Sequence, residues 1–287
     1  MSKSNEEILW QACTDGDLKI VKELADDPAV DVNWGDQGGG RTPFYRACGH
    51  GWTSVVEYLL RNPRVDVMKP RNNEATPFLI ASQEGHEEVV SLLLADPRID
   101  PNKPAYDQST PLWMASQDGH LVVVRHMLAS GREINTRMKS TFNNKTAAEQ
   151  GRATGMRTTK EAGETEEIFQ RKKINCPLCV DLIDEYEREP GHLRVIYRLR
   201  RRPGLREYFI SHLFALVVFH SDSFVVVDER TARSGTRRFF RITSQLPLDL
   251  QMVLCNRIFG SPKDIILSRD SEPGFQLLTR TTTWRQQ

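Results

Sequence analysis

The sequence predicts an all-α fold in which pairs of helices stack side by side, and two observations lead to this prediction. A segment that begins with Thr-Pro recurs at a spacing of 34 residues, at Thr42, Thr76 and Thr110. Each copy is followed by two apolar pairs, Val-Val and then Leu-Leu or Met-Leu, at helical spacing. Self-similarity at a period of about 20 to 50 residues is typical of stacked-repeat proteins, in which each unit buries the apolar face of its neighbour.

Each unit is predicted to contain two helices. The threonine hydroxyl can accept a hydrogen bond from a free backbone N–H of the first turn, and proline suits that turn because no N–H is needed there. Gly51, Gly85 and Gly119 are expected to end the first helix. The second helix follows at once, and its apolar pairs form a stripe that a single helical pair cannot cover.

Both ends of the array depart from the repeat. Residues 7–34 form a divergent first unit that lacks Thr-Pro and has Asn-Glu-Glu (residues 5–7) at the helix start, as expected of a polar capping unit. A fifth first helix is predicted from about residue 144 to 155, after which the pattern stops. Residues 152–165 are interpreted as a polar linker, with helical character returning at about Glu166. The outer face of this incomplete unit therefore needs a cover.

The recurring unit resembles the ankyrin repeat, a unit of about 33 residues with the motif T-P-L-H-x-A. The resemblance implies an all-α, ankyrin-repeat solenoid over residues 1–158, with four units and a partial fifth, from which hairpin loops project. The His of the motif is replaced here by Tyr45, Leu79 and Trp113, with Trp10 in register ahead of them. Because that His makes polar contacts between units in the family, we expect apolar packing in its place.

Residues 159–287 lose the 34-residue period but keep apolar residues at helical spacing, which predicts a helical C-terminal domain packed on the last repeat. The segment 224–227 fits either a strand or a helix. Net charge is +1 overall, but residues 1–150 carry 16 Lys and Arg against 21 Asp and Glu, a balance of −5. The remainder carries 23 against 17, a balance of +6. The two halves therefore differ in charge as well as in pattern.

Composition and cysteine usage place the chain among intracellular proteins. Hydrophobic residues make up 39% and charged residues 27% of the sequence. The longest apolar run, 209–219, is well short of the ~20 residues that cross a bilayer. The N-terminus has no secretory signal, and five cysteines at irregular spacing indicate free thiols. We expect a monomer in the cytoplasm, with the nucleus as the alternative, and no membrane contact.

Two segments imitate ligand sites. GDQGGGRT, residues 35–42, differs by one residue from a phosphate-binding loop, but Arg41 replaces the lysine and Thr42 opens a helix, so a glycine-rich hairpin tip is predicted. Cys176 and Cys179 form a C-x-x-C with His192 downstream, but the fourth zinc ligand is missing. We interpret it as a cysteine pair at the start of a helix and expect neither a metal nor a cofactor.

Two C-terminal segments leave alternatives open. Six arginines lie between Arg194 and Arg206. An intramolecular or solvent-exposed role is favoured, with nucleic-acid binding or nuclear import and an acidic protein partner as the alternatives. Residues 246–254, LPLDLQMVL, resemble the opening of an F-box, although Leu-Pro also starts ordinary helices. A helix that caps its own domain is preferred there.

The sequence predicts a non-catalytic module that binds a partner protein, because no nucleophile or paired-carboxylate motif is found. By resemblance, the concave ankyrin face carries the contacts, through residues just before Thr-Pro and just before Gly-His. Carried onto this chain, these are Gln37, Arg41, His50, Asn72, Asn73, Gln83, Glu84, Tyr106, Asp107, Gln117 and Asp118. Tyr106 is the expected dominant contact.

Asp15, Glu84 and Asp118 are in register and form an acidic stripe, which favours a partner with a basic patch. Nucleic acid is not expected to bind there. The alternative function is a substrate-receptor adaptor of a ubiquitin ligase, with an F-box-like or SOCS-box-like C-terminus. A more remote alternative is an enzyme with its activity in the C-terminal domain.

Overall fold

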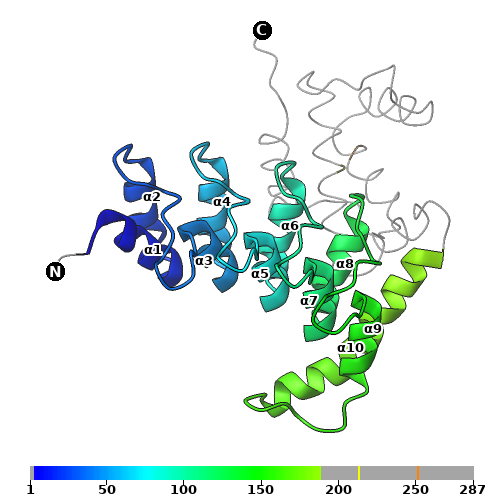
Figure 1. Cartoon of the computed structure of the whole chain (residues 1–287). Coiled ribbons are helices and arrows are strands. Elements are labelled where there is room, and N and C mark those ends of the chain that lie inside the picture. Colours follow the sequence, from blue (N-terminus) through cyan, green and yellow to red (C-terminus); the bar gives the residue numbers. More distant parts are fainter. Residues whose placement is uncertain (1–2, 189–212, 214–250, 252–287) are drawn as a thin grey trace. The chain divides into compact units, whose positions relative to one another are not determined.

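The structure is a computed structural model that describes residues 3–188 together with residues 213 and 251. Every regular element over residues 3–188 is an α-helix, as predicted (Figure 1). The chain divides into two compact units, residues 1–196 and 197–287, and all of these helices belong to the first. They are α1 (Asn5–Asp15), α2 (Leu18–Asp26), α3 (Pro43–His50), α4 (Thr53–Arg61), α5 (Pro77–Glu84), α6 (Glu87–Ala95), α7 (Pro111–Asp118), α8 (Leu121–Ala129), α9 (Ala147–Gly155) and α10 (Glu166–Arg188).

The helices of the repeats form two rows. The first helices α1, α3, α5, α7 and α9 contact one another in succession, and the second helices α2, α4, α6 and α8 do the same in the other row (Figure 1). The valine and leucine pairs of the second helices are buried between the rows. The pairing of helices predicted from the 34-residue period is therefore confirmed.

The first helices begin at the residues that the sequence marks. Thr42, Thr76 and Thr110 are the N-caps of α3, α5 and α7, and each hydroxyl accepts a hydrogen bond from the backbone N–H three residues later, at 3.1, 3.2 and 3.1 Å. All three threonines are buried, so water cannot satisfy these N–H groups and the hydroxyl must. In α1, Ser4 takes this role in a capping box with Glu7.

A glycine ends each of the helices α1, α3 and α5 and makes room for a ring from the next unit. At each of these positions φ is positive, and a Cβ would lie closer to the ring than the 3.0 Å that real contacts respect. Glycine is required twice over, for its backbone conformation and for the close approach. The pairs are Gly16 with Trp52, Gly51 with His86, and Gly85 with His120.

A column of arginines joins successive units on the side of the second helices. Arg64 donates to the carbonyl oxygens of Asp27 (2.8 Å) and Val30, Arg98 to that of Leu60 (2.8 Å), and Arg132 to those of Asp96 (3.0 Å) and Ile99 (2.6 Å). These guanidinium groups satisfy carbonyls at the end of the preceding second helix. Their 34-residue spacing is a repeat feature that the sequence prediction did not use.

Helix α10 covers the fifth unit. It packs along α9 and also contacts α8 and α7. A Cβ on Gly119 would meet the backbone of Lys172 at 3.2 Å and Sγ of Cys176 at 3.4 Å. The body of α10 therefore fills the place that a ring of the next unit fills elsewhere in the array. The predicted return of helical structure at Glu166 is confirmed.

The prediction that the Cys176–Cys179 pair lies at the start of a helix is wrong. Helix α10 has begun ten residues earlier and continues through Pro177. Proline lacks the N–H that this turn would use. Its ring packs so closely on α9 that a Cβ at Gly155 would lie 2.9 Å from the proline Cδ. Packing between the two helices compensates for the lost hydrogen bond.

Cys176 and Cys179 lie buried inside α10 as free thiols. Burial raises the pKa of both, that of Cys176 to about 11. Among the described residues no group of three or more metal-ligating side chains comes together. Several sequence predictions fall outside the described residues, namely those on His192, Arg194–Arg206, residues 224–227 and residues 246–254.

Candidate partner-binding surface

The hairpins that precede the first helices are joined to one another through their backbones. In each case a backbone N–H at one hairpin tip donates to a carbonyl oxygen of the tip before it, which links four tips in a row. The bonds run from Asn72 to Gly39 (2.9 Å), from Tyr106 to Asn73 (3.0 Å) and from Thr141 to Asp107 (2.7 Å). The structure thus brings together the predicted site residues Asn72, Asn73, Tyr106 and Asp107. We call the four linked tips (residues 36–41, 71–75, 105–109 and 140–145) and the adjoining ends of α3 and α5 the tip surface.

Two aromatic side chains stand out from neighbouring tips. Tyr106 is 78% exposed and Phe142 is 80% exposed. The backbone bond between Thr141 and Asp107 holds these two tips side by side. Sequence reasoning selected Tyr106 but missed Phe142, because the fourth hairpin, which precedes α9, is longer and moves Phe142 out of the 34-residue register. The hydrogen-bond register places Phe142 directly after the counterpart of Tyr106.

A groove of about 270 Å³ opens on the tip surface between α3 and α5. Its walls come from the two helices and from the hairpin residues just ahead of each. The lining residues are Arg41, Tyr45, Arg46, Gly49, His50, Arg71, Ile80 and Glu84. Three predicted site residues, Arg41, His50 and Glu84, therefore share one cavity, which we call the arginine groove.

Tyr45 lies in the column where the sequence predicted apolar packing in place of polar contacts. For the two tryptophans of that column the prediction is wrong, because their indole N–H groups donate to the following hairpin. Trp10 donates to the carbonyl oxygen of Arg41 (2.9 Å) and Trp113 to that of Lys145 (3.1 Å). The Tyr45 hydroxyl is buried and reaches no hydrogen-bond partner among the described residues.

The three arginines of the groove differ in their partners. Arg41 holds Asp36 through Nε (3.0 Å) and Nη2 (2.6 Å). Arg46 lies over the Trp10 ring at 4.8 Å, and Arg71 lies 6.0 Å from the centroid of the Tyr45 ring. Within the part of the chain that the structure describes, Arg46 and Arg71 form no ion pair with a carboxylate.

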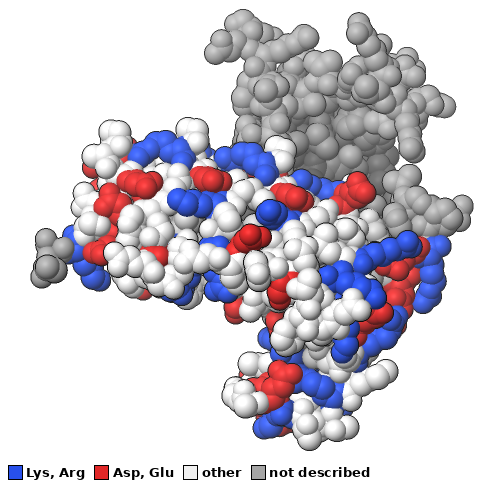
Figure 2. All heavy atoms as spheres, viewed as in Figure 1, with Lys and Arg blue, Asp and Glu red and all other residues white. Residues whose placement is uncertain are grey.

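The other ionisable groups of the groove respond to burial and to these cations. Burial and then the charge of Arg46 lower the pKa of His50, so its imidazole is neutral at pH 7. Burial and then the charge of Asp118 raise the pKa of Glu84. On the face drawn in Figure 2, acidic and basic side chains are interspersed over the array. On this face, charge selectivity depends on local arrangements of side chains.

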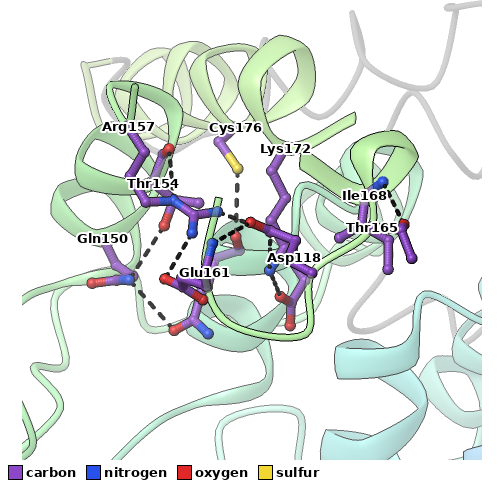
Figure 3. A network of polar contacts seen from close by, with 11 residues as sticks. Asp118, Gln150, Thr154, Arg157, Glu161, Thr165, Ile168, Lys172 and Cys176 are labelled. Carbon is purple, nitrogen blue, oxygen red and sulfur yellow. Dashed lines mark hydrogen bonds and ion pairs between the residues drawn. The ribbon is translucent and has the colours of Figure 1, made fainter. Parts of the chain in front are cut away.

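The predicted residues at the end of α7 contact their own chain (Figure 3). The Asp118 carboxylate forms an ion pair with Lys172 of α10, with 2.8 Å between Oδ1 and Nζ. The Lys172 side chain is only 11% exposed. The thiol of Cys176 donates to the backbone carbonyl of Gln117 at 3.5 Å. The side-chain amide of Gln150 donates to the side-chain oxygen of Gln117 at 3.4 Å. Gln117 and Asp118 thus hold α9 and α10 against α7.

The family comparison agrees with this geometry. The sequence model of the family described as "Ankyrin repeats (3 copies)" matches residues 9–105 and, in a second match, residues 65–138. Residues 9–138 are ankyrin repeats. Repeats of this family are in general protein–protein interaction modules and are typically non-catalytic. A search of curated proteins finds no match to the chain.

The remaining predicted residues lie at the margins of the ankyrin tips. Gln37 is exposed at the first tip, and Gln83 is half-buried near the end of α5. Arg46 and Arg71 were missed by sequence reasoning. Arg46 could have been found, because the next two units hold Ile80 and Met114 at the same position, and a charge in place of an apolar residue is a signal.

The glycine-rich segment before Thr42 forms a hairpin tip, as predicted. The backbone N–H of Gly40 donates to the carbonyl of Asp36 at 2.8 Å, and that of Asp36 donates to Arg41 at 3.2 Å. The Thr42 hydroxyl caps α3, so it is not free to serve a phosphate loop. No helix among the described residues is long and apolar enough to cross a membrane.

Proposed function

We propose that this chain is a non-catalytic ankyrin module that binds another protein through the tip surface. The observation that carries the proposal is the pair of exposed aromatics, Tyr106 and Phe142, on two tips that a backbone hydrogen bond joins. Aromatic side chains contribute large contact areas at a low entropic cost, and they are enriched among the residues that dominate interfaces. A linked backbone lowers that cost further, because the tips need not be ordered on binding.

The ends of α3 and α5 extend this surface, whereas the end of α7 does not. Asp118 has Lys172 as a cationic partner within its own chain, so it contributes little to the acidic stripe. Asp15 and Glu84 are both exposed, but Glu84 shares its groove with three arginines. We propose that any basic side chain of the partner meets Asp15 rather than a stripe of three carboxylates.

The proposal is tested with the double variant Tyr106→Ala, Phe142→Ala of the full chain. We expect partners recovered by quantitative affinity purification to fall about tenfold or more, since loss of dominant interface residues costs about 2 kcal/mol or more. Ile174→Ala is the matched control, because Ile174 is 63% exposed but lies on α10, away from the tips. Equal recovery of every partner by the double variant and the wild type would show that the tips are not the contact surface.

A further inference from the structure

We propose that the arginine groove binds the carboxylate of an acidic side chain presented by the protein partner. This inference rests on the proposed function, since it names the chemistry of one contact on the tip surface. It is independent of Tyr106 and Phe142, which lie on other hairpins. The two proposals can therefore fail separately.

The size of the groove fits one side chain. Its volume of about 270 Å³ lies just below the range of about 300 to 1,000 Å³ that is typical of small-molecule and cofactor sites. Its lining includes Tyr45 of α3 and guanidinium groups from two different hairpins and a helix. A ligand in the groove would bridge α3 and α5, because each supplies part of the lining.

The charge of the groove favours an anion. Arg41 is already neutralised by Asp36, whereas Arg46 and Arg71 have no carboxylate partner among the described residues. Glu84 is the acidic residue of the lining, so the groove keeps a positive excess. A guanidinium group presents parallel N–H donors that match the two oxygens of a carboxylate. A positively charged ligand would instead be repelled by this excess positive charge.

The Tyr45 hydroxyl supplies the second, independent indication. Tyr45 is 3% exposed, and its hydroxyl has no hydrogen-bond partner among the described residues. In the same column Trp10 and Trp113 are satisfied by the next hairpin, so the repeat geometry does not require this gap. Buried polar atoms without partners are rare in folded proteins. The hydroxyl can donate to a carboxylate once Arg71, which lies over the ring, turns toward the ligand.

The proposal names a carboxylate because the partner is a protein, whose ordinary anionic side chains are aspartate and glutamate. Inorganic phosphate carries oxygens that a guanidinium group binds equally well. The other anion source is therefore an outcome of the test rather than part of the proposal. The probes are N-acetyl-glutamate amide, its uncharged isostere N-acetyl-glutamine amide, and inorganic phosphate.

The experiment follows the side-chain N–H resonances of Arg46 and Arg71 in the ¹⁵N-labelled full chain during titration with each probe. We expect saturable shifts with the glutamate probe and none with the glutamine probe. Arg71→Gln should weaken binding about tenfold, because a charge-assisted hydrogen bond is lost. Arg137→Gln, at an exposed arginine of the loop between α8 and α9, is the matched control and should leave the affinity unchanged.

Tyr45→Phe separates a ligand-binding hydroxyl from a structural one. We expect the variant to bind the glutamate probe about fivefold more weakly, while its melting temperature stays the same or rises because an unpaired buried hydroxyl is removed. Equal shifts with both amide probes, no saturable shift, or tighter binding of phosphate than of the glutamate probe would overturn the proposal. A lower melting temperature of Tyr45→Phe with unchanged binding would do so as well.

Discussion

Substitution of Gly85 by alanine tests how strictly the array depends on the contact between each terminal glycine and the next ring. Gly85 has a φ of +80°, and a Cβ there would collide with the ring of His120. Gly163 has nearly the same φ, +83°, but a Cβ there would meet nothing within 4 Å. Gly163→Ala therefore isolates the cost of the left-handed backbone, and Gly85→Ala adds the steric term.

The expected magnitudes follow from these two terms. The backbone cost for alanine is about 1 to 2 kcal/mol at either position. Overpacking against the half-buried ring of His120 adds about 1 to 3 kcal/mol. The free energy of unfolding should therefore fall by about 2 to 5 kcal/mol for Gly85→Ala and by about 1 to 2 kcal/mol for Gly163→Ala.

Urea unfolding monitored by circular dichroism measures both changes in the full chain. Adding His120→Ala removes the ring, so the double variant should be more stable than the sum of the two single changes predicts, by about 1 to 3 kcal/mol. Equal destabilisation by Gly85→Ala and Gly163→Ala, with additive behaviour of the double variant, would refute this account of the contact.

Two further predictions concern ionisable side chains that the fold removes, wholly or in part, from water. Lys172→Met should destabilise the chain by about 3 kcal/mol and Asp118→Asn by only about 1 kcal/mol, because Lys172 keeps Glu164 at 3.4 Å whereas Asp118 loses its only ion-pair partner among the described residues. Equal losses in urea unfolding would contradict this asymmetry. Burial lowers the pKa of His120 and of His126 to about 4, so the unfolded chain binds protons that the folded chain does not as the pH falls from 6.5 to about 4. Stability should fall over this window by up to about 3 kcal/mol per histidine, and His120→Gln should remove part of that slope; an unchanged slope would show that His120 titrates normally.

Most of the array could be predicted because each repeated residue has a single local role. Thr42 and Gly51 bound a helix through hydrogen bonds and backbone conformation that involve only nearby residues. The pair Cys176 and Cys179 was predicted at the start of a helix, but α10 begins earlier and runs through it. The ring of Pro177 packs against Gly155, 22 residues away, and local sequence rules do not show such a contact.

The site was predicted less completely, because it depends on which units meet. The sequence places Asp118 in register with Glu84, but only the structure shows Lys172 against it. Arg71 and Arg46 are 25 residues apart and come together through the stacking of α3 on α5. Sequence register supplied candidates for this surface, and the fold decided which of them share a groove.

The way α10 lies on Gly119 limits how the array can grow. Every earlier glycine accepts a ring that the following unit brings with it, so those junctions can be copied when a unit is duplicated. At Gly119 the socket is filled by helix backbone and by Cys176, and no ring from another unit can enter. A further unit that brought its own ring could therefore dock at Gly119 only if α10 moved to the glycine of that new unit, so α10 acts as the end piece of the array.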